Sequence, residues 1–201
     1  MPLDAIDWKS VYAVVALLIG LFSQVFYIRG VLRGETKPHS YTWLIWTITL
    51  GIAAVGLLEG GANVLVASSL IIGAAGVFIT FLLSFKYGTK NITLNDSVLL
   101  IASFIAIFIY LQLDQPVLAV LMVSAIDGIG YIPTYRKSWS EPWSENIPAW
   151  ILITLSYVFS VLALDAYNVL TLPYLATITL ANLILIILLL IRRQNIPRPP
   201  L

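Results

Sequence analysis

The stretch Leu183-Ile-Leu-Ile-Ile-Leu-Leu-Leu190, closely followed by Arg192 and Arg193, decides the fold class. It lacks the alternation of apolar and polar residues that a strand of a membrane β-barrel would show. It belongs to an apolar segment that runs from Leu170 to Ile191, and about 20 apolar residues are enough for an α-helix to cross the hydrocarbon core. The stretch therefore predicts a transmembrane helix that ends at a basic boundary.

The composition of the whole chain leads to the same class. Of its 201 residues 60% are hydrophobic and only 10% are charged, against about a quarter in a typical soluble domain. A soluble domain of this size has too little interior to bury so many apolar side chains. The net charge of +1 provides no basic field for nucleic acid, and the absence of cysteine excludes disulfides and thiolate metal sites. A soluble enzyme, a nucleic-acid-binding protein and a disordered chain are thereby excluded.

Seven apolar segments are long enough to cross a membrane as helices, and the short connections between them carry nearly all the charge. We therefore predict an all-α transmembrane fold of seven helices. The predicted spans are Val11–Ile28, Tyr41–Leu58, Ala62–Phe85, Ser97–Leu113, Pro116–Tyr135, Pro148–Leu164 and Leu170–Ile191.

The basic residues predict how the chain lies in the membrane, because cytoplasmic loops are enriched in Lys and Arg. With seven spans, ten basic residues fall on the side of the C-terminus and only Lys9 falls on the other side. The ten are Arg29, Arg33, Lys37, Lys86, Lys90, Arg136, Lys137, Arg192, Arg193 and Arg198. We expect an integral protein of the bacterial inner membrane, with the N-terminus outside and a short cytoplasmic tail over residues 192–201.

An internal repeat divides the predicted helices into two groups. Shifting the chain by 107 residues places Arg29 on Arg136, Trp43 on Trp150 and Thr47 on Thr154. The shift pairs spans one to three with spans five to seven. We predict two parallel three-helix repeats, residues 1–85 and 116–191, joined by a linker helix within residues 86–115. Transporters are often built from such halves, with the binding site between them near the bilayer midplane.

With this 3+1+3 plan, the chain resembles the SWEET sugar transporters and the wider PQ-loop (MtN3-like) superfamily. These proteins carry a Pro-Gln pair near the cytoplasmic end of the first helix of each repeat, followed by a basic loop with serine. The first half of this chain has Ser23-Gln24 and the second half has Pro133-Thr-Tyr-Arg-Lys-Ser138, so each half has part of the motif. Stretches such as Lys37-Pro-His-Ser40 are more similar to an uncharacterised bacterial branch. Because the KDEL receptor and PnuC-type transporters share the plan, the resemblance does not name a cargo.

Asp127 is the only formal charge well inside a predicted span. Such a carboxylate is costly in lipid, so it either lines a ligand or proton site or, as a protonated acid, ties two helices together. Tyr131 shares its helical face by i, i+4 spacing. In the first span, Gln24 lies on the corresponding polar stripe.

Three further residues complete the candidate binding site. Asn182 resembles the asparagine with which SWEET proteins hydrogen-bond sugar, although an interhelical hydrogen bond is an equal alternative. Trp46 and Tyr157 lie deeper in their spans than most of the aromatic residues and could stack on a ligand. The other tryptophans are expected mainly at the membrane boundaries, where an indole keeps its N–H hydrated.

These residues predict a SWEET-like transporter that moves a small polar solute, a sugar or a similar metabolite, by alternating access. The alternatives are a membrane receptor of the same fold and an accessory membrane subunit. No nucleophile–base pair is evident, and His39 has no nearby cysteine or paired acid, so we expect no catalytic residues, no metal and no cofactor. The expected partners are the substrate and the lipid bilayer but no nucleic acid, and the plan permits an oligomer without requiring one.

Overall fold

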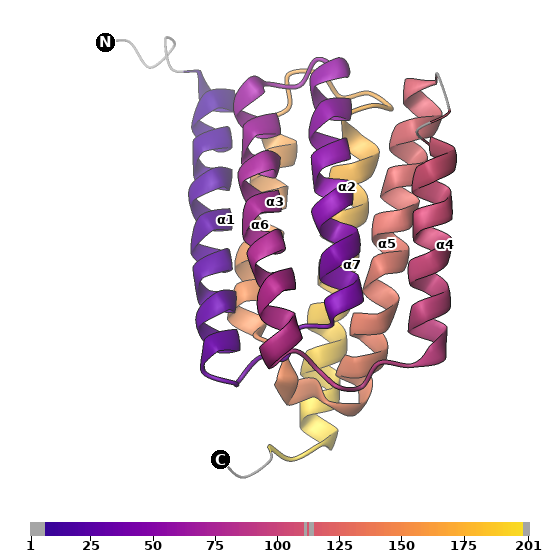
Figure 1. Cartoon of the computed structure of the whole chain (residues 1–201). Helices are drawn as coiled ribbons and strands as arrows, with labels where there is room; N and C mark the ends of the chain where they lie inside the picture. The colour runs from indigo at the N-terminus through magenta and orange to yellow at the C-terminus, as the bar shows by residue number, and fades with distance from the viewer. Residues whose placement is uncertain (1–6, 111, 113–114, 199–201) are drawn as a thin grey trace.

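The computed structural model describes residues 7–110, 112 and 115–198, and within them it contains seven α-helices, one short 3₁₀ helix and no strand. The protein therefore has an all-α transmembrane fold (Figure 1). Helices α1, α2, α3, α5 and α7 are each long and apolar enough to cross a membrane, whereas α4 and α6 are shorter apolar helices. The elements are α1 (Trp8–Leu32), α2 (Ser40–Glu59), α3 (Val64–Tyr87), α4 (Leu94–Tyr110), α5 (Pro116–Ser140), η2 (Pro142–Ser144), α6 (Ile147–Leu162) and α7 (Leu172–Asn195).

Local sequence signals set the ends of several helices. The side chains of Asn63 and Asn146 accept hydrogen bonds from the backbone N–H groups of Leu65 and Ala149, which caps α3 and α6. Prolines occupy the first turn of α5, α6 and α7, where a missing N–H costs nothing. Gly34 and Gly61 adopt positive φ values of 73° and 78° in the turns after α1 and α2.

Some helices run past the predicted apolar spans at the end where the basic residues lie. Helix α5 continues beyond Tyr135 to Ser140, and α7 continues beyond Ile191 to Asn195. The predicted end of the fourth span at Leu113 lies outside the described residues. Residues 1–6 of the predicted first repeat and 199–201 of the predicted tail also lie outside them.

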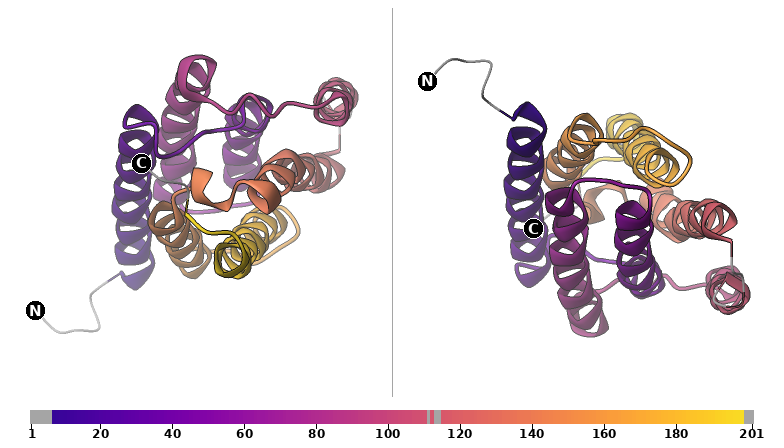
Figure 2. Two further views of the ribbon diagram at one scale, coloured as in Figure 1. Left: turned by 90° about the horizontal axis from the view of Figure 1, so that it is seen from below. Right: turned by 90° about the horizontal axis from the view of Figure 1, so that it is seen from above.

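The contacts between the helices have a two-fold pattern that relates α1, α2 and α3 to α5, α6 and α7. Helix α1 packs against α3 and α6, while α5 packs against α7 and α2, and the pairs α2–α3 and α6–α7 also make contact. Exchanging α1, α2 and α3 with α5, α6 and α7 leaves this set of contacts unchanged. Helix α4 packs mainly against α5 and lies at the edge of the bundle (Figure 2). The boundaries of the repeats at residues 85 and 116 stay predictions.

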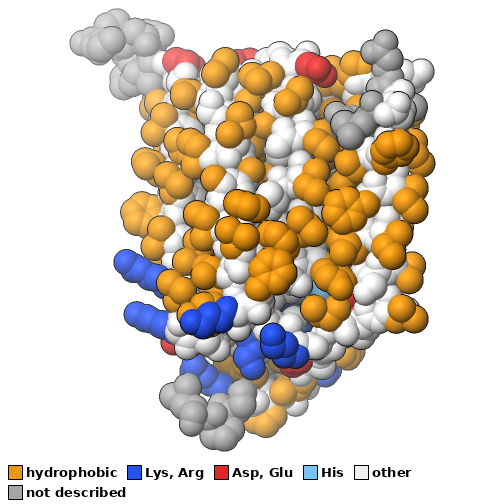
Figure 3. Space-filling view, in the orientation of Figure 1, with side chains coloured by type: hydrophobic (Ala, Val, Ile, Leu, Met, Phe, Trp, Pro, Cys, Tyr) orange, Lys and Arg blue, Asp and Glu red, His pale blue; other side chains and the backbone are white. Residues whose placement is uncertain are grey.

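The surface has the polarity of a membrane protein. Large apolar side chains such as Phe22, Ile71, Ile101 and Ile187 are exposed on the sides of the bundle. Figure 3 shows this apolar belt, with Lys and Arg side chains gathered below it, at the end where α1, α3, α5 and α7 terminate. We call this end the basic end. Lipid tails, rather than water, would cover an apolar surface of this kind.

Candidate functional site

A cavity of about 340 Å³ lies inside the bundle. Residues of α1, α2, α3, α5, α6 and α7 line it, and none of its lining residues belongs to α4. All six residues that the sequence singled out as a binding site line this one cavity. They are Gln24, Trp46, Asp127, Tyr131, Tyr157 and Asn182. The packing of the six helices thus brings together side chains that are up to 158 residues apart, from 24 to 182.

Asp127 is 1% exposed and projects from α5. The hydroxyl of Thr49 on α2 donates a hydrogen bond to its Oδ1 atom. The backbone carbonyl of the same residue accepts a hydrogen bond from Nε1 of Trp46, at 3.3 Å. Among the described residues, no Lys, Arg or His forms an ion pair with this carboxylate. Sequence reasoning missed Thr49, because a hydroxyl on a different helix has no spacing relation to an aspartate on α5.

Asn182 and Tyr131 form a second polar contact in the cavity wall. The hydroxyl of Tyr131 donates to Oδ1 of Asn182 at 2.7 Å. The Nδ2 atom of the same amide is buried and has no hydrogen-bond partner in the part of the chain that the structure describes. The hydroxyl of Tyr174, which is part of the cavity lining and is buried, lies beside the Asp127 carboxylate and the Thr49 hydroxyl. Tyr174 lies in the first turn of α7 after Pro173, and no sequence signal indicated that it reaches the cavity.

The side chain of Gln24 extends from α1 to α3, where its Nε2 atom donates a hydrogen bond to the hydroxyl of Thr80 at 2.8 Å. Gly76 makes room for it, because a Cβ atom at that position would lie 2.5 Å from Cγ of Gln24. On α6, next to Tyr157, Ser156 donates to the carbonyl oxygen of Ala16 at 2.7 Å. These contacts tie α1 to the helices on both of its sides.

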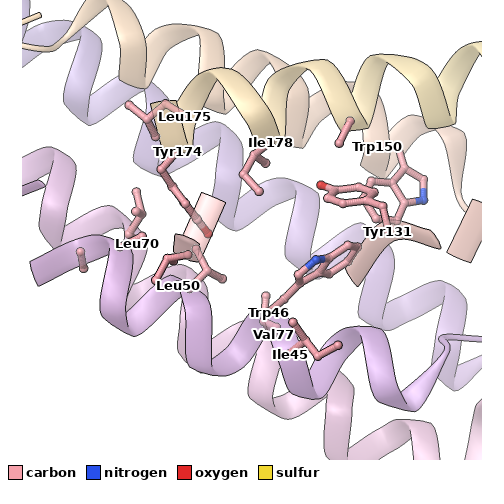
Figure 4. Packing of buried hydrophobic residues seen from close by; sticks show 14 of the residues in the cluster. Ile45, Trp46, Leu50, Leu70, Val77, Tyr131, Trp150, Tyr174, Leu175 and Ile178 are labelled. Atoms are coloured by element: carbon pink, nitrogen blue, oxygen red, sulfur yellow. The ribbon is translucent and has the colours of Figure 1, made fainter. Parts of the chain in front are cut away.

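Five aromatic residues form a cluster on the cavity wall nearer the basic end. Tyr27 lies 4.7 Å from Trp43, and Trp46 lies 4.4 Å from Tyr131 and 5.9 Å from Trp150, measured between ring centroids. Figure 4 shows Trp46, Tyr131 and Trp150 close together, with Tyr174 reaching from α7 into the same interior. We call Tyr27, Trp43, Trp46, Tyr131 and Trp150 the aromatic cluster.

The aromatic cluster corrects one expectation. Trp43 and Trp150 are buried, so they do not lie at a membrane boundary in contact with water. They occupy the inner faces of α2 and α6, where they pack against other rings. Trp8 and Trp139, in contrast, are largely exposed near opposite ends of the bundle, as a boundary position requires.

Beyond the aromatic cluster, at the basic end, Glu145 lies at the centre of a buried polar network. Its carboxylate is hydrogen-bonded by Lys137, by the hydroxyl of Tyr27 at 3.0 Å and by Nε1 of Trp150 at 2.9 Å. The Lys137 ammonium also donates to the backbone carbonyl of Lys37 at 2.7 Å. Lys137 is 0% and Glu145 is 3% exposed. We call Tyr27, Lys37, Lys137, Glu145 and Trp150 the Glu145 network.

This network shows that Lys137 does not lie in a solvated loop, as its place after the fifth apolar segment suggested. Helix α5 continues to Ser140, and its last turns place the ammonium inside the bundle. The charge is tolerated there because it is paired and hydrogen-bonded.

A second polar cluster joins α4 to the rest of the basic end. The expectation that His39 has no paired acid is wrong, because its Nε2 atom lies 3.4 Å from the carboxylate of Asp96. Arg136 binds the same carboxylate through two nitrogens, at 2.6 and 3.2 Å. Burial lowers the pKa of His39 from its ordinary value, and the neighbouring Asp96 offsets part of this shift. Among the described residues, no group of three His, Cys, Asp or Glu side chains could hold a metal ion.

Comparisons of the chain with protein-family models, with curated proteins and with solved structures found no match. What the cavity binds is therefore inferred from its own side chains.

Proposed function

We propose that this protein is a membrane transporter that moves a small polar solute by alternating access, on the plan of the SWEET and PQ-loop proteins. The observation that carries the proposal is the central cavity, which α1, α2, α3, α5, α6 and α7 wall together. Transporters built from repeats bind their cargo at the interface between the repeats, near the bilayer midplane. Asp127 and Asn182 are buried polar groups in the wall of this cavity, and such groups inside a membrane commonly serve a ligand.

The contacts at the basic end support a gate. There the aromatic cluster and the Glu145 network join α1 and the loop after it to α5 and α6. The backbone N–H of Lys37 also donates to the carbonyl oxygen of Ser144 at 2.9 Å, which links the two repeat-related loops. In the transport cycle these contacts separate, so that solute reaches the cavity from the basic end. A buried ion pair contributes little net free energy relative to its hydrated charges, so water that enters can replace the contact.

We also propose that the basic end faces the cytoplasm of a bacterium and that the N-terminus lies outside. Ten of the eleven Lys and Arg residues lie in the loops and helix ends on this side, which is the bias expected of cytoplasmic segments. The protein would then be oriented in the plasma membrane with the Glu145 network as its cytoplasmic gate.

A receptor that binds the same solute without moving it is the alternative. A receptor for a charged signal would favour a cavity with several charges, whereas Asp127 is the single acidic or basic residue among the described residues that line this cavity. We therefore favour transport over signal binding, and we propose no catalytic reaction.

Reconstitution into liposomes tests the proposal. Liposomes that contain the purified protein are loaded with unlabelled sugars, amino acids, nucleosides or amines in turn. The exchange of each internal solute for the same labelled solute outside is then measured. We expect saturable exchange of at least one class. Binding without exchange would favour a receptor, and the absence of both would contradict the proposal.

The chain contains no cysteine, which makes a sharper test of the gate simple. In the variant Lys37→Cys with Ser144→Cys, a short bifunctional thiol reagent should hold the two loops together. We expect exchange to stop on cross-linking and to return when a reductant cleaves the link. The two single-cysteine variants, treated in the same way, are the controls and should keep their activity.

A further inference from the structure

We propose that the cargo is a small organic cation whose nitrogen pairs with Asp127 and whose hydrogen-bond acceptor meets Asn182. This inference rests on the proposed transport function and narrows its cargo. It selects cations over the sugars that the resemblance to SWEET proteins implies.

The charge of the cavity gives the first reason. Asp127 is the single carboxylate among the described lining residues, and no Lys, Arg or His is among them. A carboxylate inside a membrane protein is costly unless a proton or a cation compensates it. The chain provides the Thr49 hydroxyl but no cation, so a bound cation would complete the pair. An anionic cargo would face uncompensated repulsion at low dielectric constant.

The supply of free hydrogen-bonding groups gives the second reason. Most polar side chains of the cavity are already occupied within the protein. Ser23, Ser69 and Ser156 donate to backbone carbonyls, and the Gln24 amide donates to Thr80.

Within the described residues, Nδ2 of Asn182 is a buried lining atom that has no hydrogen-bond partner, whereas the hydroxyl of Tyr174 lies beside Asp127 and Thr49. The acceptor oxygen of a bound cation can take the free N–H of this amide.

The aromatic lining gives the third reason. Trp46, Tyr131, Tyr157 and Tyr174 surround the same cavity as Asp127, and the faces of such rings attract cations. Figure 4 shows the rings of Trp46 and Tyr131 beside each other, and that of Tyr174 farther along the interior, next to Leu50. A carboxylate beside aromatic rings is a suitable environment for an ammonium group, whether primary or methylated.

The geometry of the site sets the size of the cation. Asp127 and Tyr131 are one helical turn apart on α5, about 6 Å along the axis. Tyr131 donates a hydrogen bond to the amide of Asn182. The acceptor oxygen of the cargo should therefore lie about 6 Å from the cargo's nitrogen, the length of one helical turn. The cavity of about 340 Å³ lies at the lower end of the range for small-molecule sites, so the ligand should be small. These limits describe an ammonium compound with a carbonyl or hydroxyl group a few bonds away.

A matched pair of ligands tests the proposal. Acetylcholine has a methylated nitrogen and a carbonyl at suitable separation, and in its uncharged isostere a carbon atom replaces the nitrogen. Phenethylamine and its uncharged carbon isostere form a second pair, and glucose represents the sugars. Binding to the purified protein is followed by tryptophan fluorescence, because Trp43, Trp46 and Trp150 line the cavity.

We expect at least one cation to bind ten-fold or more tightly than its isostere and more tightly than glucose. Asp127→Asn should abolish that preference while the isostere still binds, and Asp127→Glu should retain it. The retained affinity for the isostere shows that the Asn variant is folded. Equal binding of cation and isostere, tighter binding of glucose, an unchanged preference in the Asn variant, or no binding of any cation would each overturn the inference.

Exchange in liposomes separates this inference from the proposed function. If a neutral solute is exchanged and no cation binds, transport stands and the cation inference fails. If a cation binds with the predicted dependence on Asp127 but nothing is exchanged, the site stands and transport fails.

Discussion

The hydroxyl of Ser23 on α1 donates a hydrogen bond to the carbonyl oxygen of Ala149 on α6, at 2.7 Å. On the other side of the bundle, Thr42 on α2 donates to the carbonyl oxygen of Gly130 on α5, at 2.9 Å. Since 23 + 107 = 130 and 42 + 107 = 149, the two contacts join positions that the 107-residue shift relates. The contacts differ in that the donor lies on α1 in the first and on α2 in the second. The interfaces α1–α6 and α2–α5 are therefore held together at equivalent points.

We expect Ser23→Ala and Thr42→Val each to lower the free energy of unfolding by about 0.6–1.7 kcal/mol, the range for hydrogen bonds between membrane helices. Thr42→Val should have the larger effect, because the hydroxyl of Thr134 also donates to Thr42. Thermal unfolding in detergent measures both. Thr47→Val is the matched control, since that hydroxyl bonds only to the carbonyl of Trp43 on its own helix. An equal loss in all three variants would contradict the role of the interhelical contacts.

The close approach of α1 and α3 depends on Gly76. A Cβ atom there would lie 2.5 Å from Cγ of Gln24, so Gly76→Ala should displace Gln24 and destabilise the protein by about 1–3 kcal/mol. Gly73 lies almost one turn earlier on the same helix, and a Cβ atom there would meet nothing within 4 Å. Gly73→Ala should therefore be neutral or stabilising. Melting temperatures give the comparison, and Gln24→Ala should rescue Gly76→Ala if the clash is the cause.

Removing one member of the buried pair between Lys137 and Glu145 should be costly. Lys137→Met leaves the Glu145 carboxylate buried without its cation, and we expect a loss of about 3–5 kcal/mol. Glu145→Gln should cost a similar amount, because the ammonium then lacks its counter-ion. In the double variant no uncompensated charge remains, so much of the stability should return. A double-mutant cycle of unfolding free energies tests this, and additive losses would show that the two charges act independently.

The buried histidine predicts a pH dependence of stability. Burial lowers the pKa of His39 in the folded protein, so between that pKa and about 6.5 the unfolded chain binds a proton that the folded protein does not. The contribution of the neutral His39 side chain to the free energy of unfolding is therefore complete above pH 6.5 and is lost as the pH falls below that value. Asp96 favours the charged imidazole, whereas Arg136 and Lys137 disfavour it.

We expect the melting temperature of the wild-type protein to fall more between pH 6.5 and pH 5 than that of His39→Gln. Glutamine retains a hydrogen-bonding side chain near Asp96 but has no proton to take up in this range. Parallel pH profiles of the two proteins would show that another group controls the acid sensitivity.

Much of the cavity could be predicted from the sequence because polar residues are scarce in the spans. Asp127 and Asn182 stand out in apolar segments, and helical periodicity places Tyr131 on the same face as Asp127. Thr49 and Tyr174 could not be predicted. Threonine and tyrosine are common in membrane helices, and only the packing of α2 and α7 against α5 directs these two toward Asp127 and the cavity.

The basic end shows where sequence patterns stop being informative. A basic residue after an apolar segment predicts a boundary, and the exposed Arg29 fits that expectation. Lys137 follows its segment in the same way but is buried, because α5 continues and Glu145, eight residues later at the end of η2, supplies a counter-charge. Likewise, His39 and Asp96 are 57 residues apart and meet only when the start of α4 packs beside the loop before α2.

By itself the sequence determined the class of the protein, since seven long apolar segments with so few charges are stable as helices in lipid and not in water. It also predicted a repeat, because a shift of 107 residues places like residues on one another, such as Trp43 on Trp150. The tertiary structure decided which polar groups meet: Thr49 with Asp127, Tyr131 with Asn182, and His39 with Asp96. The physical reason is that a helix fixes the spacing along its own axis, whereas pairing across helices depends on how their faces pack.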